Sequence, residues 1–195
     1  MATIQTTLQN FEELLRRYAV RWTTKPNQEV ESYGDYTNDD LSYVTIVRNM
    51  LYRHKKLNIK YHTYDMQDAE DIIYAKNHPG IMVFSSDTEH PYLYGRVLDL
   101  FHIDVANNGP NALFSDGSAG RLDMVWVHWY ELDQHQEPSG FSSLRYPSIS
   151  LCKNTDAFAH GLVHPDEIVR RVHLIPNFKL LAPGMEEYEK VQVDM

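Results

Sequence analysis

Residues 121–131, RLDMVWVHWYE, constrain the fold most, because this β-strand pattern carries two of the chain's three tryptophans. Successive side chains of a strand point to opposite faces of its sheet. One face of this strand would hold Val125, Val127 and Trp129, and the other would hold Met124, Trp126, His128 and Tyr130. Bulk on both faces predicts a strand that is covered on both sides. The second face has two alternative interpretations, a recognition pocket and a metal site that includes the histidine.

The rest of the chain is mostly short runs of strand-forming residues between turn signals. Several such strands with few helices predict a mainly β (α+β) fold, a strongly bent antiparallel sheet or small barrel. Helical patterns occur near the N-terminus, as one or two turns within residues 65–76, and at residues 165–171, where the charges match a helix dipole. The expected strands cover residues 43–47, 57–63, 81–84, 92–105, 121–131, 144–151 and 172–176.

Three segments differ in pattern and predict the domain organisation. Residues 1–40 combine an N-terminal helix with an acidic linker, residues 41–180 form the β domain, and residues 181–195 are a charged tail with slight helical character. The helix has an apolar stripe at helical spacing, and Asn10 with Glu13 is a candidate capping pair, with a start at Thr6 or Thr7 as the alternative. The stripe consists of Leu8, Phe11, Leu14, Leu15, Tyr18 and Trp22.

Composition narrows the classes of function. A single cysteine, Cys152, allows no internal disulfide and no cysteine-based zinc site. The formal net charge of −9 disfavours general nucleic-acid binding, which needs a basic surface, and is compatible with a basic partner. No apolar run approaches the length of a membrane span, and the N-terminus lacks the pattern of a signal peptide. We therefore expect a soluble, intracellular protein without a membrane partner.

Several motifs resemble, in the same order, the C-terminal region of proteins encoded by Plavaka-type, CACTA-like DNA transposons of mushroom-forming fungi. The matching segments are residues 52–55, 61–65, 90–102, 125–130 and 164–178. His128 stands where that family has an arginine, and Gly95 stands where it has an alanine. The resemblance implies a nuclear protein connected with DNA transposition. It covers no part of the family's upstream catalytic region, so it implies an accessory domain without catalytic residues.

Two strand patterns, around residues 81–101 and 124–131, also resemble bromo-adjacent-homology (BAH) domains, with residues 168–174 as the closing strand. BAH domains are protein-interaction modules of chromatin, and some bind histone tails through aromatic cages. The arginine–proline pair that usually follows the second strand is replaced here by Glu131 and Leu132. This resemblance implies a BAH-like barrel that binds a protein partner.

The leading functional hypothesis is a non-enzymatic interaction module with an aromatic pocket for a basic peptide or histone tail. Aromatic ring faces attract cations, and a nearby carboxylate strengthens the attraction. Glu131 or Asp133 would supply the acid. The alternative interpretation is that these rings belong to the core, where large aromatic side chains contribute mainly by burial. The candidate aromatic residues are Tyr92, Tyr94, Trp126, Trp129 and Tyr130.

The runner-up hypothesis is an auxiliary nucleic-acid-binding domain that contacts phosphate through two basic clusters. Their residues are Arg53, Lys55, Lys56, Arg170 and Arg171, and the alternative is that these are solvated charges at turns and helix ends.

A third hypothesis is a histidine-metal hydrolase, in which His102 and Asp104 share one strand face and His128 lies on a neighbouring strand. His160 and His164 are four residues apart, but the glycine and proline beside them disfavour a continuous helix. No metal-binding run such as HExxH, no nucleophile elbow and no phosphate-binding glycine loop is present, and no base for Cys152 is identifiable. We therefore predict no catalytic residue, no bound metal and no cofactor.

Overall fold

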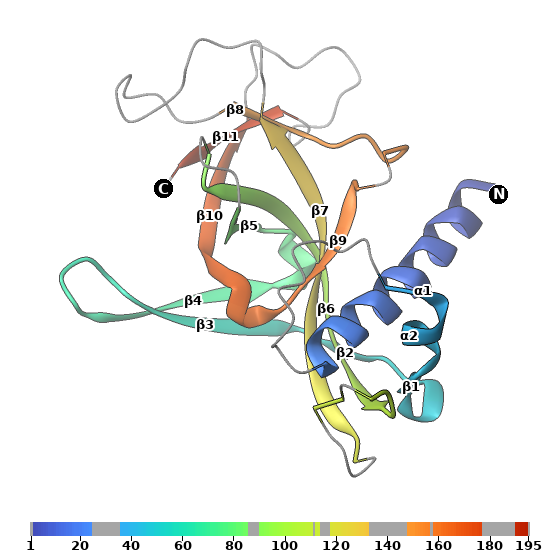
Figure 1. Ribbon diagram of the computed structural model, residues 1–195. Helices are drawn as coiled ribbons and strands as arrows, with labels where there is room; N and C mark the ends of the chain where they lie inside the picture. Colours follow the sequence, from blue (N-terminus) through green and yellow to red (C-terminus); the bar gives the residue numbers. More distant parts are fainter. Residues whose placement is uncertain are drawn as a thin grey trace. The chain divides into compact units, whose positions relative to one another are not determined.

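The computed structural model describes residues 2–24, 36–85, 90–110, 112–113, 118–132, 148–156, 158–176 and 190–194. Over these residues the protein is mainly β, with antiparallel strands and few helices (Figure 1). The chain divides into two compact units, one made of Met1–Arg53 and Phe101–Met124 and the other of His54–Leu100 and Val125–Met195. The division falls inside the strands β2, β6 and β7, so each of them contributes residues to both units.

The first unit begins with helix α1 (Ala2–Thr23), which confirms the N-terminal helix but starts before the predicted capping pair. Its apolar stripe is buried at Leu15 and Tyr18, and the Tyr18 hydroxyl donates a 2.7 Å hydrogen bond to the backbone oxygen of Asp123. The unit continues with helix α2 (Asn38–Ser42), strand β1 (Val44–Ile46), the 3-10 helix η1 (Val47–Asn49) and most of strand β2 (Tyr52–His54). Strand β1 pairs antiparallel with the end of β6, with Val44 opposite Asn107.

Strands that lie wholly or partly in the second unit are hydrogen-bonded in a ring. The order is β6-β5-β10-β11-β8-β7, and the ring closes because β6 and β7 also pair with each other. Strand β9 pairs with β7 along the same edge as β8, at different residues of β7. These strands are β5 (Gly80–Phe84), β6 (Tyr92–Asn107), β7 (Gly120–Leu132), β8 (Ser148–Leu151), β9 (His160–Val163), β10 (Ile168–Pro176) and β11 (Lys190–Asp194). These pairings confirm the mainly β fold with an antiparallel sheet.

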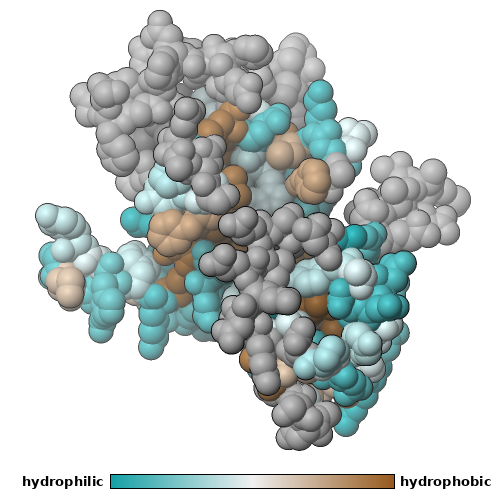
Figure 2. All heavy atoms as spheres, in the orientation of Figure 1, coloured by the Kyte–Doolittle hydropathy of each residue, from teal (hydrophilic) through white to brown (hydrophobic). Residues whose placement is uncertain are grey.

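Strands β3 (Lys56–His62) and β4 (Asp68–Tyr74) form a separate two-stranded hairpin that extends to the left in Figure 1. Leu57, Ile59 and Tyr61 share one face of it, as their alternation predicts. Ile59 and Ile73 are buried in a core cluster of the second unit, which anchors the base of the hairpin. The rest of the hairpin surface is largely hydrophilic (Figure 2).

Three helix predictions are wrong. Residues 68–74 form strand β4, because Ile73 and Ala69 pair with Leu57 and Tyr61 of β3, and this pairing outweighs the acidic composition. Only Pro165–Glu167 form a 3-10 helix, η3, after which β10 begins at Ile168. Residues 190–194 form strand β11 where slight helical character was expected, so residues 172–176 are not the last strand; residues 181–189 of the predicted tail lie outside the described residues.

A glycine inside a strand can mark a bulge or bend, but Gly95 of β6 pairs in register with Ile81 of β5. Arg53 and His54 belong to strand β2 rather than to a turn, and only Lys55 bends before β3. Residues 144–147 of the predicted strand lie outside the described residues, and β8 begins at Ser148.

The two faces of β7 are both covered in the second unit. Val125 and Val127 lie in a core cluster with residues of β3, β4, β5 and β9, and Trp129 packs against it. On the other face Tyr130 lies in a second cluster with residues of β5, β6, β8 and β10. His128, on that same face, is only 6% exposed. The bulk on both faces of this strand is therefore largely explained by packing.

Candidate functional site

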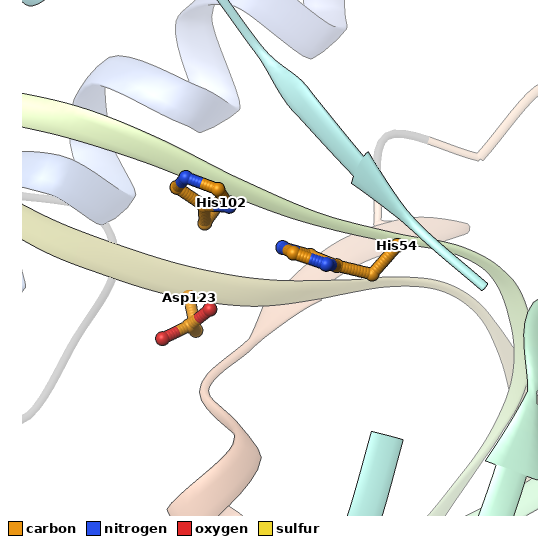
Figure 3. Close-up of side chains that lie close together, drawn as sticks. All are labelled: His54, His102 and Asp123. Atoms are coloured by element: carbon orange, nitrogen blue, oxygen red, sulfur yellow. The ribbon is translucent and has the colours of Figure 1, made fainter. Parts of the chain in front are cut away.

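Three potential metal ligands converge in the described part of the chain: His54, His102 and Asp123 (Figure 3). Each offers one ligand atom, and these atoms all lie within 4.8 Å of one another. His54 is the last residue of β2, directly after two residues of the first unit, while His102 and Asp123 lie on the first-unit parts of β6 and β7. All three side chains are half-buried.

Two neighbouring side chains orient this group. The ring of Tyr52, also on β2, stacks on His102 with centroids 4.6 Å apart and planes 10° from parallel. Arg121 forms an ion pair with Asp123, with 2.6 Å between Nη2 and Oδ1 and with Nε 3.1 Å from each carboxylate oxygen. The hydrogen bond to Asp123 raises the pKa of Arg121, and the negative charges of Asp123 and Asp104 act in the same direction.

The candidate aromatic residues lie on different faces of the sheet. Tyr94 and Tyr130 are buried in one core cluster, and Tyr92 packs against that cluster. Trp129 packs against the other cluster, on the opposite face of β7. Trp126 is half-buried with its ring 6.0 Å from that of His160, and Glu131 is exposed. Asp133 lies outside the described residues.

Phe84, the last residue of β5, lies beside the candidate Tyr92, the first residue of β6, and leaves a ring open to solvent there. Phe84 is 70% exposed and pairs across the strands with Tyr92, with ring centroids 5.8 Å apart. Tyr94 follows on the same face of β6, where its ring lies 5.6 Å from that of His90. Burial raises the pKa of Tyr94 and that of Tyr130 to about 12, so both phenols stay neutral near pH 7. Sequence reasoning missed Phe84, although it ends an apolar run.

His128 and His160 form a stacked pair in the second unit, with ring centroids 4.4 Å apart and planes at 27°. The Nε2 atom of His128 lies 2.8 Å from the backbone oxygen of Cys152. Burial lowers the pKa of both histidines, and burial raises the pKa of the Cys152 thiol, which keeps the thiol protonated. His164, in contrast, caps η3 by accepting a 3.2 Å hydrogen bond from the backbone N–H of Asp166.

The basic candidates are mostly exposed and only partly grouped. Lys55 and Lys56 lie where the chain enters the β3–β4 hairpin, and the guanidinium of Arg170 lies 5.4 Å from the centre of the Tyr61 ring on the same hairpin. Arg171 is exposed, and its backbone N–H donates to Asp71. Arg53 is exposed on β2.

Sequence reasoning named His102 as a candidate metal ligand in its third hypothesis but did not include His54 or Asp123. His54 lies within a run of basic residues that resembled a turn, and Asp123 looked like one of several scattered acids. Both residues lie in strands, His54 in β2 and Asp123 in β7. The signal available in the sequence was the alternation of side chains between the two faces of a strand. The pairing of β2, β6 and β7, which brings the ligands together, is not encoded in any local pattern.

Comparisons with protein-family models, with curated proteins and with solved structures found no significant match. Among the described residues, no helix is both long and apolar enough to cross a membrane.

Proposed function

We propose that this chain is a protein-interaction module that binds a lysine-rich peptide segment on the aromatic surface formed by Phe84 and Tyr92. The observation that carries the proposal is the exposure of Phe84, which leaves a large ring open to solvent beside a second ring. Two rings at this spacing present adjacent π-faces and edges to a cation. The base of the surface is rigid, because Tyr92 packs against the buried cluster of Tyr94 and Tyr130.

Charge supports a cationic partner. The chain carries a formal net charge of −9, which attracts a basic peptide over long range and speeds its association. In this proposal the partner is a histone tail and the module is a BAH-like domain of a transposon-derived fungal protein in the nucleus. The ordered motifs that resemble the fungal transposon family support that origin, and the ring of antiparallel strands is compatible with a BAH-like barrel.

The alternative, an auxiliary nucleic-acid-binding domain, is favoured by one observation, the exposure of Lys55, Lys56 and Arg171 in the second unit. Phosphate contacts of this kind weaken steeply as salt is added, because binding releases counterions. Cation–aromatic contacts depend less on salt. A steep salt dependence of DNA binding, together with the effect of removing the Phe84 and Tyr92 rings on peptide binding, therefore separates the two functions.

The test measures the affinity of the full chain for a lysine-rich histone-tail peptide, with and without trimethylated lysine, and for a DNA duplex. Each of the changes Phe84→Ala and Tyr92→Ala is expected to weaken peptide binding by about 2- to 30-fold, the range of cation–π contacts. Phe158→Ala is the matched control, because Phe158 is 86% exposed and lies in the turn before β9. Equal affinity of wild type and both variants would refute the proposal. Steeply salt-dependent DNA binding, lost when Lys55 and Lys56 are replaced, would favour the alternative.

A further inference from the structure

The geometry points to a function independent of the aromatic surface: we propose that His54, His102 and Asp123 bind a divalent transition-metal ion. Two imidazole nitrogens and one carboxylate oxygen are a ligand set that suits Zn²⁺ and its first-row neighbours. Calcium and magnesium are disfavoured, because they prefer sites made of oxygen atoms alone. The proposal concerns ion binding and assigns no reaction to the site.

The spacing of the ligand atoms fits an ion after small side-chain movements. Bonds of about 2.0–2.2 Å to a tetrahedral Zn²⁺ place its ligands roughly 3.3–3.6 Å apart. The three ligand atoms already lie within 4.8 Å of one another, so rotations of the side chains about their own bonds are sufficient. Strands hold the backbone positions, which keeps the ligands close before an ion arrives. Figure 3 shows the three side chains converging from three strands.

The neighbours of the ligands resemble the outer contacts that orient ligands in metal sites. Tyr52 stacks on His102 and limits the rotation of its ring. Arg121 holds the Asp123 carboxylate from one side, and a carboxylate has about four acceptor positions, so it can bind an ion and a guanidinium together. Arg121 also brings a positive charge near the ion, while Asp104 adds a negative charge that acts on Arg121.

The site retains access to solvent. All three ligands are half-buried, so water reaches the group without a large conformational change. Three protein ligands leave at least one position of a tetrahedral ion open. That position would hold water or a further ligand, as in zinc sites that are not purely structural.

The chain supplies its own matched control. His62 and Asp68 on the hairpin form an ion pair with 2.8 Å between Nδ1 and Oδ1, which is the same pair of residue types. Their side chains are 72% and 90% exposed, and they do not belong to the three-ligand group. The change His62→Ala therefore removes a histidine beside an acid without touching the proposed site.

The experiment uses the full chain without an affinity tag, treated with a chelator, and titrates Zn²⁺ and Co²⁺ by calorimetry. Wild type is expected to bind one ion per chain at the site. Loss of an outer contact typically costs 10- to 100-fold in metal affinity, so His102→Ala and Asp123→Asn, which remove direct ligands, are expected to cost at least about 100-fold. His62→Ala is expected to bind as wild type does.

A second measurement keeps the proposal testable if a variant does not fold. In wild type, Zn²⁺ should move the NMR signals of the ring nitrogens of His54 and His102 and leave those of His62 unchanged. The proposal is overturned if wild type binds neither ion, if His102→Ala binds with unchanged affinity, or if Zn²⁺ moves other histidine signals and not these two.

Discussion

The substitution Gly161→Ala should destabilise the second unit because the side chain of Trp129 fills the space beside this glycine. A Cβ atom at Gly161 would lie 3.0 Å from Cε2 and 3.2 Å from Cζ2 of Trp129, and closer still to Nε1, whereas ordinary contacts are 3.4–4 Å. The indole cannot simply shift away, because a Cβ built at Gly95 would lie 3.2 Å from Cε3 and Cζ3 at its other edge. Trp129 is thus closely approached by two glycines on β6 and β9.

The expected cost follows from overpacking. Forcing an extra carbon into a packed region typically costs about 1–3 kcal/mol. Gly161 pairs in register with Val127, so the added methyl group acts through this clash rather than through the backbone conformation. For a chain of this size such a cost lowers the Tm by roughly 2–12 °C.

The assay is a double-mutant cycle on stability, with unfolding by urea followed by circular dichroism. Trp129→Phe removes the part of the indole that the new methyl group would strike, so Gly161→Ala should cost much less in that background. The coupling free energy should reach roughly 0.5–3 kcal/mol, as expected for residues in contact. If Gly161→Ala costs the same in both backgrounds, the clash with Trp129 is not the cause and the reasoning is wrong.

Three further predictions concern buried polar groups. Tyr18→Phe removes the hydrogen bond to the backbone oxygen of Asp123 and should lower the free energy of unfolding by roughly 1–3 kcal/mol, measured by urea denaturation. Tyr94→Phe should be neutral or stabilising in the same assay, because the buried hydroxyl has no hydrogen-bond partner among the described residues. Burial lowers the native pKa of His128 and of His160, so the unfolded chain takes up more protons as the pH falls below about 6.5. Stability should therefore fall from pH 7 towards the lowered native pKa values and then level off, and a titration of Tm against pH should show a shallower fall for His160→Asn.

The sequence predicted those parts of the fold in which one short segment decides its own structure. Strands β3 and β7 alternate between two faces along their length, so the residues on each face could be assigned from the amino-acid pattern alone. Helix α1 shows its stripe in the same way, and Leu15 and Tyr18 are buried as expected. In these segments local pattern and tertiary environment agree.

The failures occur where a partner elsewhere in the chain decides the structure. The acidic sequence of strand β4 suggested one or two helical turns, and its pairing with β3 makes it extended instead. Strand β11 pairs with both β8 and β10, which precede it by many residues and leave no trace in its own composition. Such long-range pairing overrides weak local preference, which is the usual limit of propensity arguments for strands.

The candidate metal site also depends on strand pairing that local sequence does not reveal. Alternation within one strand predicts only which of its own side chains share a face. His102 and Asp104 share one face of β6, which the sequence allowed us to predict. The residues that join His102 depend on which strands lie beside β6, and the paired strands there are β2 and β7. The sequence hypothesis grouped His128 with His102 because it expected His128 on a neighbouring strand. His128 does lie on β7, but five residues beyond Asp123, and its ring contacts His160 instead. A shift of five residues along a strand is about 17 Å, so the register of β7 decides which of its side chains can join His102.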